Sequence, residues 1–315
     1  MTSIIISEDN PYQTLITNAN NDPCQLQSDY DNHRVTRNAQ QSAKILAEDF
    51  PGWTLDEVLM RLDGPGKEDG FVDPRHSLVV WAKPPSQVRE LISFIQRQLR
   101  DVAPTLWLMP SGNLHATVLE VAHSLPEAQI EGLVETLQSS KDISTSQIAD
   151  YSFTHRARLV KPMVSFDSAA MALSFVPAAG ERSGSQQTLD DDTYSYHHLR
   201  RDVFDMVRKA GIPVASRYSV PSAHLTIARF ITQDGFLKEE RDAEGQRQID
   251  HSQVKLLIDK IGDINKQLQS EYWPRENGTI RDGGEWLVGQ EKGLVIQKGR
   301  LWYGDGENVL RGKGY

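Results

Sequence analysis

The sequence contains two short motifs in which one residue separates a histidine from a threonine, His115-Ala-Thr117 and His224-Leu-Thr226. Histidine exchanges protons near neutral pH, so one imidazole can accept a proton while a second donates one. A threonine hydroxyl can donate a hydrogen bond to a phosphoryl oxygen on which charge develops. Two such pairs in one cleft would suit phosphodiester cleavage, with the histidines as general acid and base and the threonines binding the phosphate.

Both motifs lie in stretches typical of β-strands, LHATVLEVA and SAHLTIARF. Side chains on a strand alternate between its two faces, so the histidine and threonine of each motif should share one face. The intervening residues, Ala116 and Leu225, should then point into the core. The alternative at each position is a buried, hydrogen-bonded core histidine with no catalytic role.

The stretches around the two motifs share the predicted order strand, helix, strand, strand, and the second half has one further strand before it. In the first half, HSLVVWA predicts a strand, SQVRELISFIQRQL a helix with an apolar stripe, and TLWLM and LHATVLEVA two more strands. The second half predicts strands at RLVKPMVSFDS and AAMALSFV, a helix at YSYHHLRRDVFDMVRKAG, and strands at VASRYSV and SAHLTIARF. A Pro-Ser pair precedes each motif. We therefore expect an internal duplication: an α+β fold of two lobes, with two antiparallel sheets facing a central cleft and helices outside.

Three regions are expected along the chain. Residues 1–32 are polar and lack periodicity, which predicts a disordered tail, and residues 33–74 predict a helical extension. Residues 75–315 would form the catalytic domain. Its two closely packed lobes would span about 75–142 and 150–315.

Some details of these regions can also be predicted. In the extension, Thr54 should cap a helix. In the second lobe, residues 239–248 are expected to form a charged loop before the helix VKLLIDKIGDINKQL. The segment EWLVGQEKGLVIQKGRLWYG is expected to be a hairpin that turns near Gly293.

The composition limits the classes of function. A net charge of −9 and a pI near 5.5 lack the broad basic surface of proteins that bind long nucleic acids, so we expect a small-molecule nucleotide or an RNA terminal phosphate as substrate. The single cysteine, Cys24, excludes an intramolecular disulfide and a cysteine-based zinc site. Without a secretory signal or a membrane-spanning run, a cytoplasmic or nuclear monomer is expected. The chemistry calls for no metal or cofactor.

Four other residues are candidate substrate contacts. Asn113 and Ser222 each lie two residues before a motif histidine, so each should face the same side of its strand as that histidine. Each could instead cap its turn. Arg217 could bind a phosphate and Tyr218 could stack on a base. Because Pro221 interrupts the strand alternation, the sequence does not decide which of the two faces the site. Arg229 lies at odd spacing from His224, so it should face away from the site in an ion pair.

The segments GNLHATVLEV, YHHLRRDVFD, SRYSVPSAHLTIARF and the C-terminal GRLWYG resemble the 2H phosphoesterase superfamily, most of all its fungal branch described as RNA ligase/cyclic nucleotide phosphodiesterase-like. The resemblance covers roughly residue 75 to the C-terminus. It implies a bilobed fold and action on 2′,3′-cyclic phosphates or related phosphodiesters of RNA ends and ADP-ribose. The histidine and threonine of both motifs match the family pattern, whereas the substrate does not carry over because members differ in it.

The leading hypothesis is therefore a metal-independent cyclic phosphodiesterase. Two alternatives remain from the sequence. One is a biosynthetic or tailoring enzyme that uses the same cleft on a non-nucleotide substrate. The other is a module that binds a nucleotide or RNA end without turnover, although binding alone would not need two imidazoles at matched positions.

Overall fold

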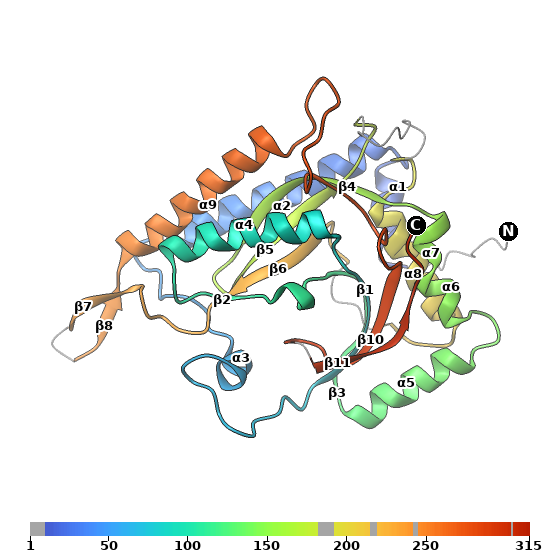
Figure 1. Cartoon of the computed structure of the whole chain (residues 1–315), viewed down its shortest axis with the longest axis horizontal. Coiled ribbons are helices and arrows are strands. Elements are labelled where there is room, and N and C mark those ends of the chain that lie inside the picture. The colour runs from blue at the N-terminus through green and yellow to red at the C-terminus, as the bar shows by residue number, and fades with distance from the viewer. Residues whose placement is uncertain (1–9, 182–191, 215–218, 242–244, 304) are drawn as a thin grey trace.

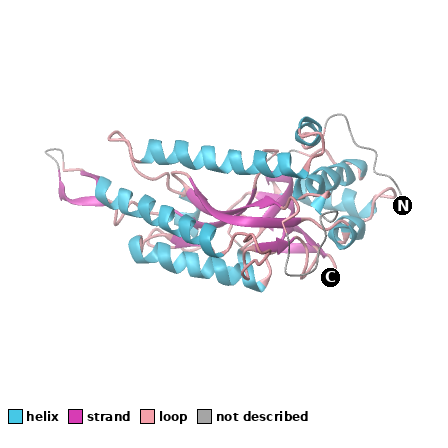
Figure 2. Ribbon diagram, turned by 90° about the horizontal axis from the view of Figure 1, so that it is seen from above, coloured by secondary structure: helices cyan, strands magenta, loops and turns pink. Residues whose placement is uncertain are grey.

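The computed structural model describes residues 10–181, 192–214, 219–241, 245–303 and 305–315 (Figure 1). The described chain is an α+β fold in which strands lie in the interior and helices cover them on either side (Figure 2). None of the described helices is long and apolar enough to cross a membrane.

Two antiparallel sheets form the interior of the fold. Sheet A has four strands, and sheet B has five. Each motif is carried by one of them, the first by β3 of sheet A and the second by β6 of sheet B. In spatial order, sheet A consists of β11 (Asp305–Arg311), β10 (Leu294–Arg300), β1 (His76–Ala82) and β3 (Ala116–Leu125), and sheet B of β2 (Trp107–Leu108), β6 (Ala223–Arg229), β5 (Ala170–Pro177), β4 (Arg158–Phe166) and β9 (Glu285–Leu287).

The longer helices cover these sheets. Helix α5 (Glu127–Ser139) packs on sheet A, α2 (Pro23–Ile45) packs on β4 and β5 of sheet B, and α8 (Tyr196–Lys209) packs against β3. Helices α4 (Ser86–Val102) and α9 (His251–Glu271) pack against each other. The apolar stripe predicted for α4 is confirmed, because all five of its members are buried: Val88, Leu91, Ile92, Ile95 and Leu99.

The remaining elements are short. They are α1 (Gln13–Asn18), α3 (Glu57–Leu62), the 3-10 turn η1 (Ser111–Asn113), α6 (Thr145–Ala149), α7 (Tyr151–Thr154), and the hairpin of β7 (Leu237–Arg241) and β8 (Arg247–Ile249). The charged loop predicted for residues 239–248 is therefore wrong in its described part, which contributes to this hairpin. Only the ends of the predicted strand VASRYSV are described, and neither end is in a strand.

The N-terminal region differs from the expected tail. Residues 10–32 are ordered in α1 and the first part of α2, and Tyr12, Leu26 and Tyr30 are fully buried. The apolar residues of this segment are few and widely spaced, so its overall composition is polar. The few that are present are nevertheless buried in the core and hold the segment in place. A cap signal was present, since Asp22 accepts a hydrogen bond from the Cys24 backbone N–H and Pro23 begins the helix.

Helix α3 begins later than predicted. Its N-cap is Asp56, whose side chain accepts a hydrogen bond from the Leu59 N–H. Thr54 instead pairs its hydroxyl with that of Ser168, next to β5. Threonine and aspartate are both good N-cap residues. The hydroxyl of Thr54 is used in its bond to Ser168, and Asp56 caps the helix.

The C-terminal strands join different sheets, so the predicted hairpin around Gly293 is wrong. β9 pairs with β4 in sheet B, whereas β10 pairs with β1 and β11 in sheet A. Likewise β2, from the first half of the chain, lies at the edge of sheet B. The strands of the two sheets thus cross the expected lobe boundaries at 75–142 and 150–315, because β10 and β11 extend sheet A from the second half and β2 extends sheet B from the first.

Candidate active site

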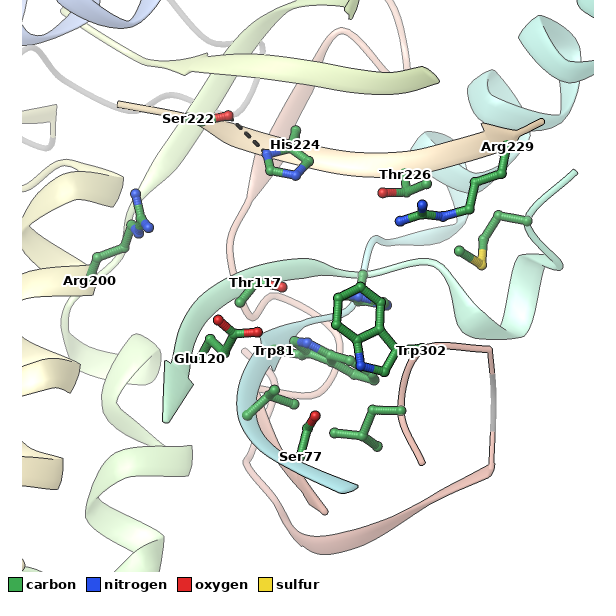
Figure 3. A pocket seen from close by; sticks show the side chains of 14 residues that line it. Ser77, Trp81, Thr117, Glu120, Arg200, Ser222, His224, Thr226, Arg229 and Trp302 are labelled. Atoms are coloured by element: carbon green, nitrogen blue, oxygen red, sulfur yellow. Dashed lines mark hydrogen bonds between the residues drawn. The ribbon is translucent and has the colours of Figure 1, made fainter. Parts of the chain in front are cut away.

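The two motifs line one pocket between the sheets. His115 directly precedes β3, His224 is the second residue of β6, and these strands are in contact. Both histidines and both threonines line this pocket. In Figure 3, His224 and Thr226 lie on one ribbon, and Thr117 and Trp81 lie on the ribbons that face it.

The alternation predicted for the motifs is confirmed by burial. The two intervening residues, Ala116 and Leu225, are fully buried in the core. The four motif side chains are instead only partly buried and border the pocket. The structure therefore favours accessible histidines over histidines enclosed in the core.

His115 is held by an indole ring and a backbone carbonyl. Its ring stacks on Trp81 with centroids 3.6 Å apart and planes at 14°. Its Nδ1 lies 2.7 Å from the carbonyl oxygen of Asn113. A carbonyl can only accept, so Nδ1 carries the hydrogen and, in the neutral ring, Nε2 carries the lone pair. Burial, and then the charge of Lys83, lower the pKa of His115 to about 3.

His224 has a different partner. Its Nδ1 lies 2.9 Å from the Ser222 hydroxyl, which can donate or accept, so this bond fixes neither tautomer. Burial, followed by the charges of Arg200 and Arg229, lowers the pKa of His224 to about 4, while Asp167 acts in the opposite direction. Both motif histidines are therefore neutral at pH 7 in the free protein.

A β-bulge follows each threonine. In β3, Thr117 pairs with Trp81 and Leu119 pairs with Val80, so Val118 is the extra residue. In β6, consecutive residues of β5 pair with Thr226 and Ala228, which leaves Ile227 as the extra residue. A bulge of this kind shifts the alternation by one position, so that the third residue after each threonine turns toward the pocket.

The residues brought in by these bulges are Glu120 and Arg229, and both line the pocket. The prediction that Arg229 faces away is wrong, because alternation without a bulge assigns it to the other face. Its predicted ion pair does exist, with Arg229 Nη1 3.2 Å from Asp56 Oδ2. Its Nε is buried and has no hydrogen bond within the described part of the chain. Asp56 also accepts a hydrogen bond from the Tyr303 hydroxyl.

Arg200, from α8, connects the helical layer to both motif strands. Its guanidinium is buried and donates to the carbonyl of the bulge residue Val118 at 3.2 Å. It also donates to the carbonyl of Val220, just before the second motif, at 2.8 Å. A third bond reaches the Tyr12 hydroxyl at 3.3 Å. Arg200 thus fixes the backbone of both motif strands and ties the N-terminal segment to the site.

Of the four residues predicted to contact the substrate, the structure describes two, Asn113 and Ser222. Ser222 lines the pocket through its contact with His224. Asn113 holds His115 through its backbone, and its side chain donates to the carbonyl of Tyr303 at 3.2 Å. Arg217 and Tyr218 lie outside the described residues.

Sequence reasoning missed Trp81, Glu120 and Arg200. No local signal marks Trp81 or Arg200, since their places depend on strand pairing and helix packing. Glu120 and Arg229 did share one signal, their equal spacing from the two threonines.

The pocket continues past each histidine. Beyond His224 a second cavity opens toward α2, where it is bordered by His33 and by Arg37, which lies 3.7 Å from Asp167. Beyond His115 a cavity bordered by Trp81 and Lys83 continues away from the motifs. In the described residues, no three histidine, cysteine or acidic side chains are grouped so that they could hold a metal ion.

No family model matches the chain, and no curated protein matches it. Several solved structures are similar to part of the chain at low identity and low TM-score. TT0787 of Thermus thermophilus is 14% identical with a TM-score of 0.37, and the match covers 75% of this chain and 96% of that one. A conserved protein of unknown function, ATU0111 of Agrobacterium tumefaciens, is 12% identical with a TM-score of 0.40 and coverage of 81% and 99%. Kluyveromyces marxianus Usb1 is 9% identical with a TM-score of 0.35 and coverage of 75% and 98%.

Proposed function

We propose that this protein is a metal-independent phosphodiesterase of the 2H type, which acts on a 2′,3′-cyclic phosphate or a related phosphodiester of a nucleotide or RNA end. The observation that carries the proposal is that both histidine–threonine pairs border one pocket from two different sheets. Each sheet would then form the floor of one lobe, with the scissile phosphate held between them.

In this proposal His115 is the general base. The carbonyl of Asn113 keeps the hydrogen on Nδ1, so the Nε2 lone pair can take a proton from water. The water oxygen attacks phosphorus, and the bond from phosphorus to one ribose oxygen breaks. His224, protonated, delivers its proton to that departing oxygen. The product is a ribose phosphate monoester, and the step leaves His115 protonated and His224 neutral. Before the next turnover, His115 releases its proton to solvent and His224 takes one up.

The acidic role of His224 depends on the substrate's charge. Its pKa of about 4 in the free protein leaves it mostly neutral at pH 7. A bound phosphodiester anion beside the ring favours the imidazolium and raises this pKa. The Thr117 and Thr226 hydroxyls would donate to the non-bridging oxygens, and the buried Nε of Arg229 supplies a charged donor on the same side as His224.

The test is hydrolysis of adenosine 2′,3′-cyclic phosphate in excess EDTA. We expect turnover in EDTA, and a loss of about 10²–10⁴-fold in kcat/KM for His115→Ala and for His224→Ala. His251, an exposed histidine at the start of α9, provides the matched control, and His251→Ala should behave as wild type.

Three results would reject the proposal. Loss of activity in EDTA with recovery on added zinc would point to a metal mechanism. Full activity in both motif variants would place the reaction elsewhere. Binding of the cyclic nucleotide by calorimetry without turnover over hours would make the pocket a binding module.

A further inference from the structure

Beyond His115, the cavity leads to a group of basic side chains. The cavity bordered by His115, Trp81 and Trp302 also touches Lys83 and Gln297. These last two residues border a further cavity that is lined by Arg89, Lys292 and Arg311. The two cavities and the motif pocket therefore adjoin one another through shared lining residues. We call Lys83, Lys292 and Arg311 the basic cluster.

The basic cluster gathers three cations that have no acidic partner among the described residues. None of its three members forms a salt bridge within the described residues, in a chain with 43 acidic and 34 basic residues. Glu291, which precedes Lys292 in the sequence, is an acidic neighbour, but its carboxylate is bonded to other residues. It accepts from the Ser86 N–H at 2.9 Å and lies 3.3 Å from Arg89 Nη1. Like charges gathered without a counter-charge repel one another, which is typical of a site that receives an anion.

Lys83 joins the basic cluster to the catalytic pocket. Its ammonium lies 4.8 Å from the centre of the Trp81 ring, whose indole stacks on His115. Burial, followed by the charges of Lys292 and Arg311, lowers the pKa of Lys83 to about 8. A bound anion would relieve both effects. The cavity beyond His224 lacks this character, because Arg37 there already faces Asp167.

We propose that the basic cluster is a second phosphate site, which binds another phosphate of the nucleotide whose scissile phosphodiester lies between His115 and His224. The inference rests on the proposed function for the identity of its ligand. The second phosphate could be the 5′-phosphate of a mononucleotide or the next phosphate of an oligonucleotide. The protein would then prefer phosphorylated RNA ends over nucleosides that carry only a cyclic phosphate.

A binding experiment tests the site without relying on turnover. Inorganic pyrophosphate is titrated calorimetrically into the wild type, the double variant Lys292→Ala/Arg311→Ala, and Lys313→Ala as the control. Lys313 is an exposed cation two residues from Arg311 and outside the basic cluster. We expect the double variant to bind about 10-fold or more weakly, with Lys313→Ala unchanged. Equal affinity in all three proteins, or an equal loss in Lys313→Ala and the double variant, overturns the site.

A kinetic experiment identifies the source of the phosphate. Adenosine 2′,3′-cyclic phosphate is compared with its 5′-phosphorylated form and with a dinucleotide that ends in a cyclic phosphate. We expect kcat/KM to rise about 10-fold for at least one phosphorylated substrate, and this preference to vanish in the double variant and to weaken with salt. Preference for the first identifies a 5′-phosphate, and preference for the dinucleotide alone identifies an internucleotide phosphate. No preference in the wild type overturns the inference.

The two proposals can fail separately. If no cyclic nucleotide is cleaved, the proposed function fails, while the pyrophosphate titration still decides whether the basic cluster binds anions. If cyclic nucleotides are cleaved in EDTA and the double variant binds pyrophosphate like the wild type, the proposed function stands and the second site is wrong. Both substituted side chains are exposed, so the variants should fold.

Discussion

The strands β3 and β6 deliver their motifs to the pocket by the same backbone route. In each, a histidine and a threonine share one face, a bulge follows the threonine, and the third residue beyond it reaches the pocket. The surroundings of the two motifs then differ. His115 is stacked on an indole and bonded to a carbonyl, whereas His224 is bonded to a hydroxyl. The two positions after the bulges differ in chemical type, since one is the acidic residue Glu120 and the other the basic residue Arg229.

Under the proposed function, this difference would give two similar strand geometries two different chemical roles. The bulged strands decide where the imidazoles lie, and their neighbours decide which proton state each one favours. A carbonyl partner keeps a lone pair ready on His115, which suits a base. A hydroxyl partner can accept a hydrogen bond from a protonated His224, and a bound phosphate anion would offset the nearby arginine charges that disfavour the proton, which would suit an acid. Variants of these residues can separate the two roles.

The largest expected effect separates base from acid. A good leaving group needs no proton, so a 4-nitrophenyl ester of a nucleoside 3′-phosphate should bypass the acid but still need the base. We expect His224→Gln to lose about 10²–10⁴-fold in kcat on the cyclic phosphate and less than about 10-fold on the ester. His115→Gln should lose the larger factor on both substrates. The reverse pattern would exchange the two roles, and equal losses on both substrates would refute the division.

The next effect concerns the residues placed by the two bulges. Arg229→Met removes a charged donor beside the phosphate, so kcat/KM should fall about 10–100-fold, the size of one charge-assisted hydrogen bond. Glu120→Gln removes a negative charge from the opposite strand and should lower KM a few-fold. Thermal melts of both variants serve as the control, because Arg229 also pairs with Asp56. Equal effects of the two variants on KM would show that these positions do not act on the phosphate's charge.

How far the sequence predicts the site depends on the range of the interactions involved. Local alternation correctly predicts that Ala116 and Leu225 are buried and that the motif side chains border the pocket. It fails at Arg229, since a bulge is a property of two paired strands and not of one. Trp81 reaches His115 because it pairs with Thr117 across sheet A. That register is set by contacts between distant segments, which a single sequence does not display.

The N-terminal segment shows the same limit. Its buried aromatic residues gain their environment from α8, where His197 bonds to the Tyr30 hydroxyl at 2.8 Å and to the Tyr12 carbonyl at 3.0 Å. The polar sequence between these anchors resembles a disordered tail when it is considered alone. The α+β class with antiparallel sheets could be predicted because it depends on the periodicity of long elements, whereas the structure does not confirm the predicted bilobed duplication. The packing of the N-terminal segment could not be predicted, because it depends on a few specific long-range bonds.

A smaller effect concerns the pKa of His115. The charge of Lys83 contributes to lowering this pKa, so Lys83→Met should raise it by a few tenths to about one unit, with no comparable change at His224. A base is active when neutral, so a higher pKa moves the acidic side of the kcat/KM profile to higher pH. Side-chain NMR titration of the His115 ring measures the shift directly. Lys292→Met is the control and should move it less. An unchanged or lower pKa in Lys83→Met would contradict the assigned cause.

The smallest effect tests the hydroxyl partner of His224. In the protonated ring, Nδ1–H can donate to the Ser222 oxygen, so this bond stabilises the imidazolium by about 1 kcal/mol. Ser222→Ala should therefore lower the pKa of His224 by several tenths of a unit and kcat about 2–5-fold, while Ser222→Thr, which keeps the hydroxyl, should stay close to wild type. An acid is active when protonated, so its activity falls as pH rises through its pKa, and a lower pKa moves the alkaline side of the kcat profile to lower pH. If Ser222→Ala moves the acidic side of the profile instead, His224 is the base. The hydroxyl and the carbonyl would then have been assigned to the wrong halves of the reaction.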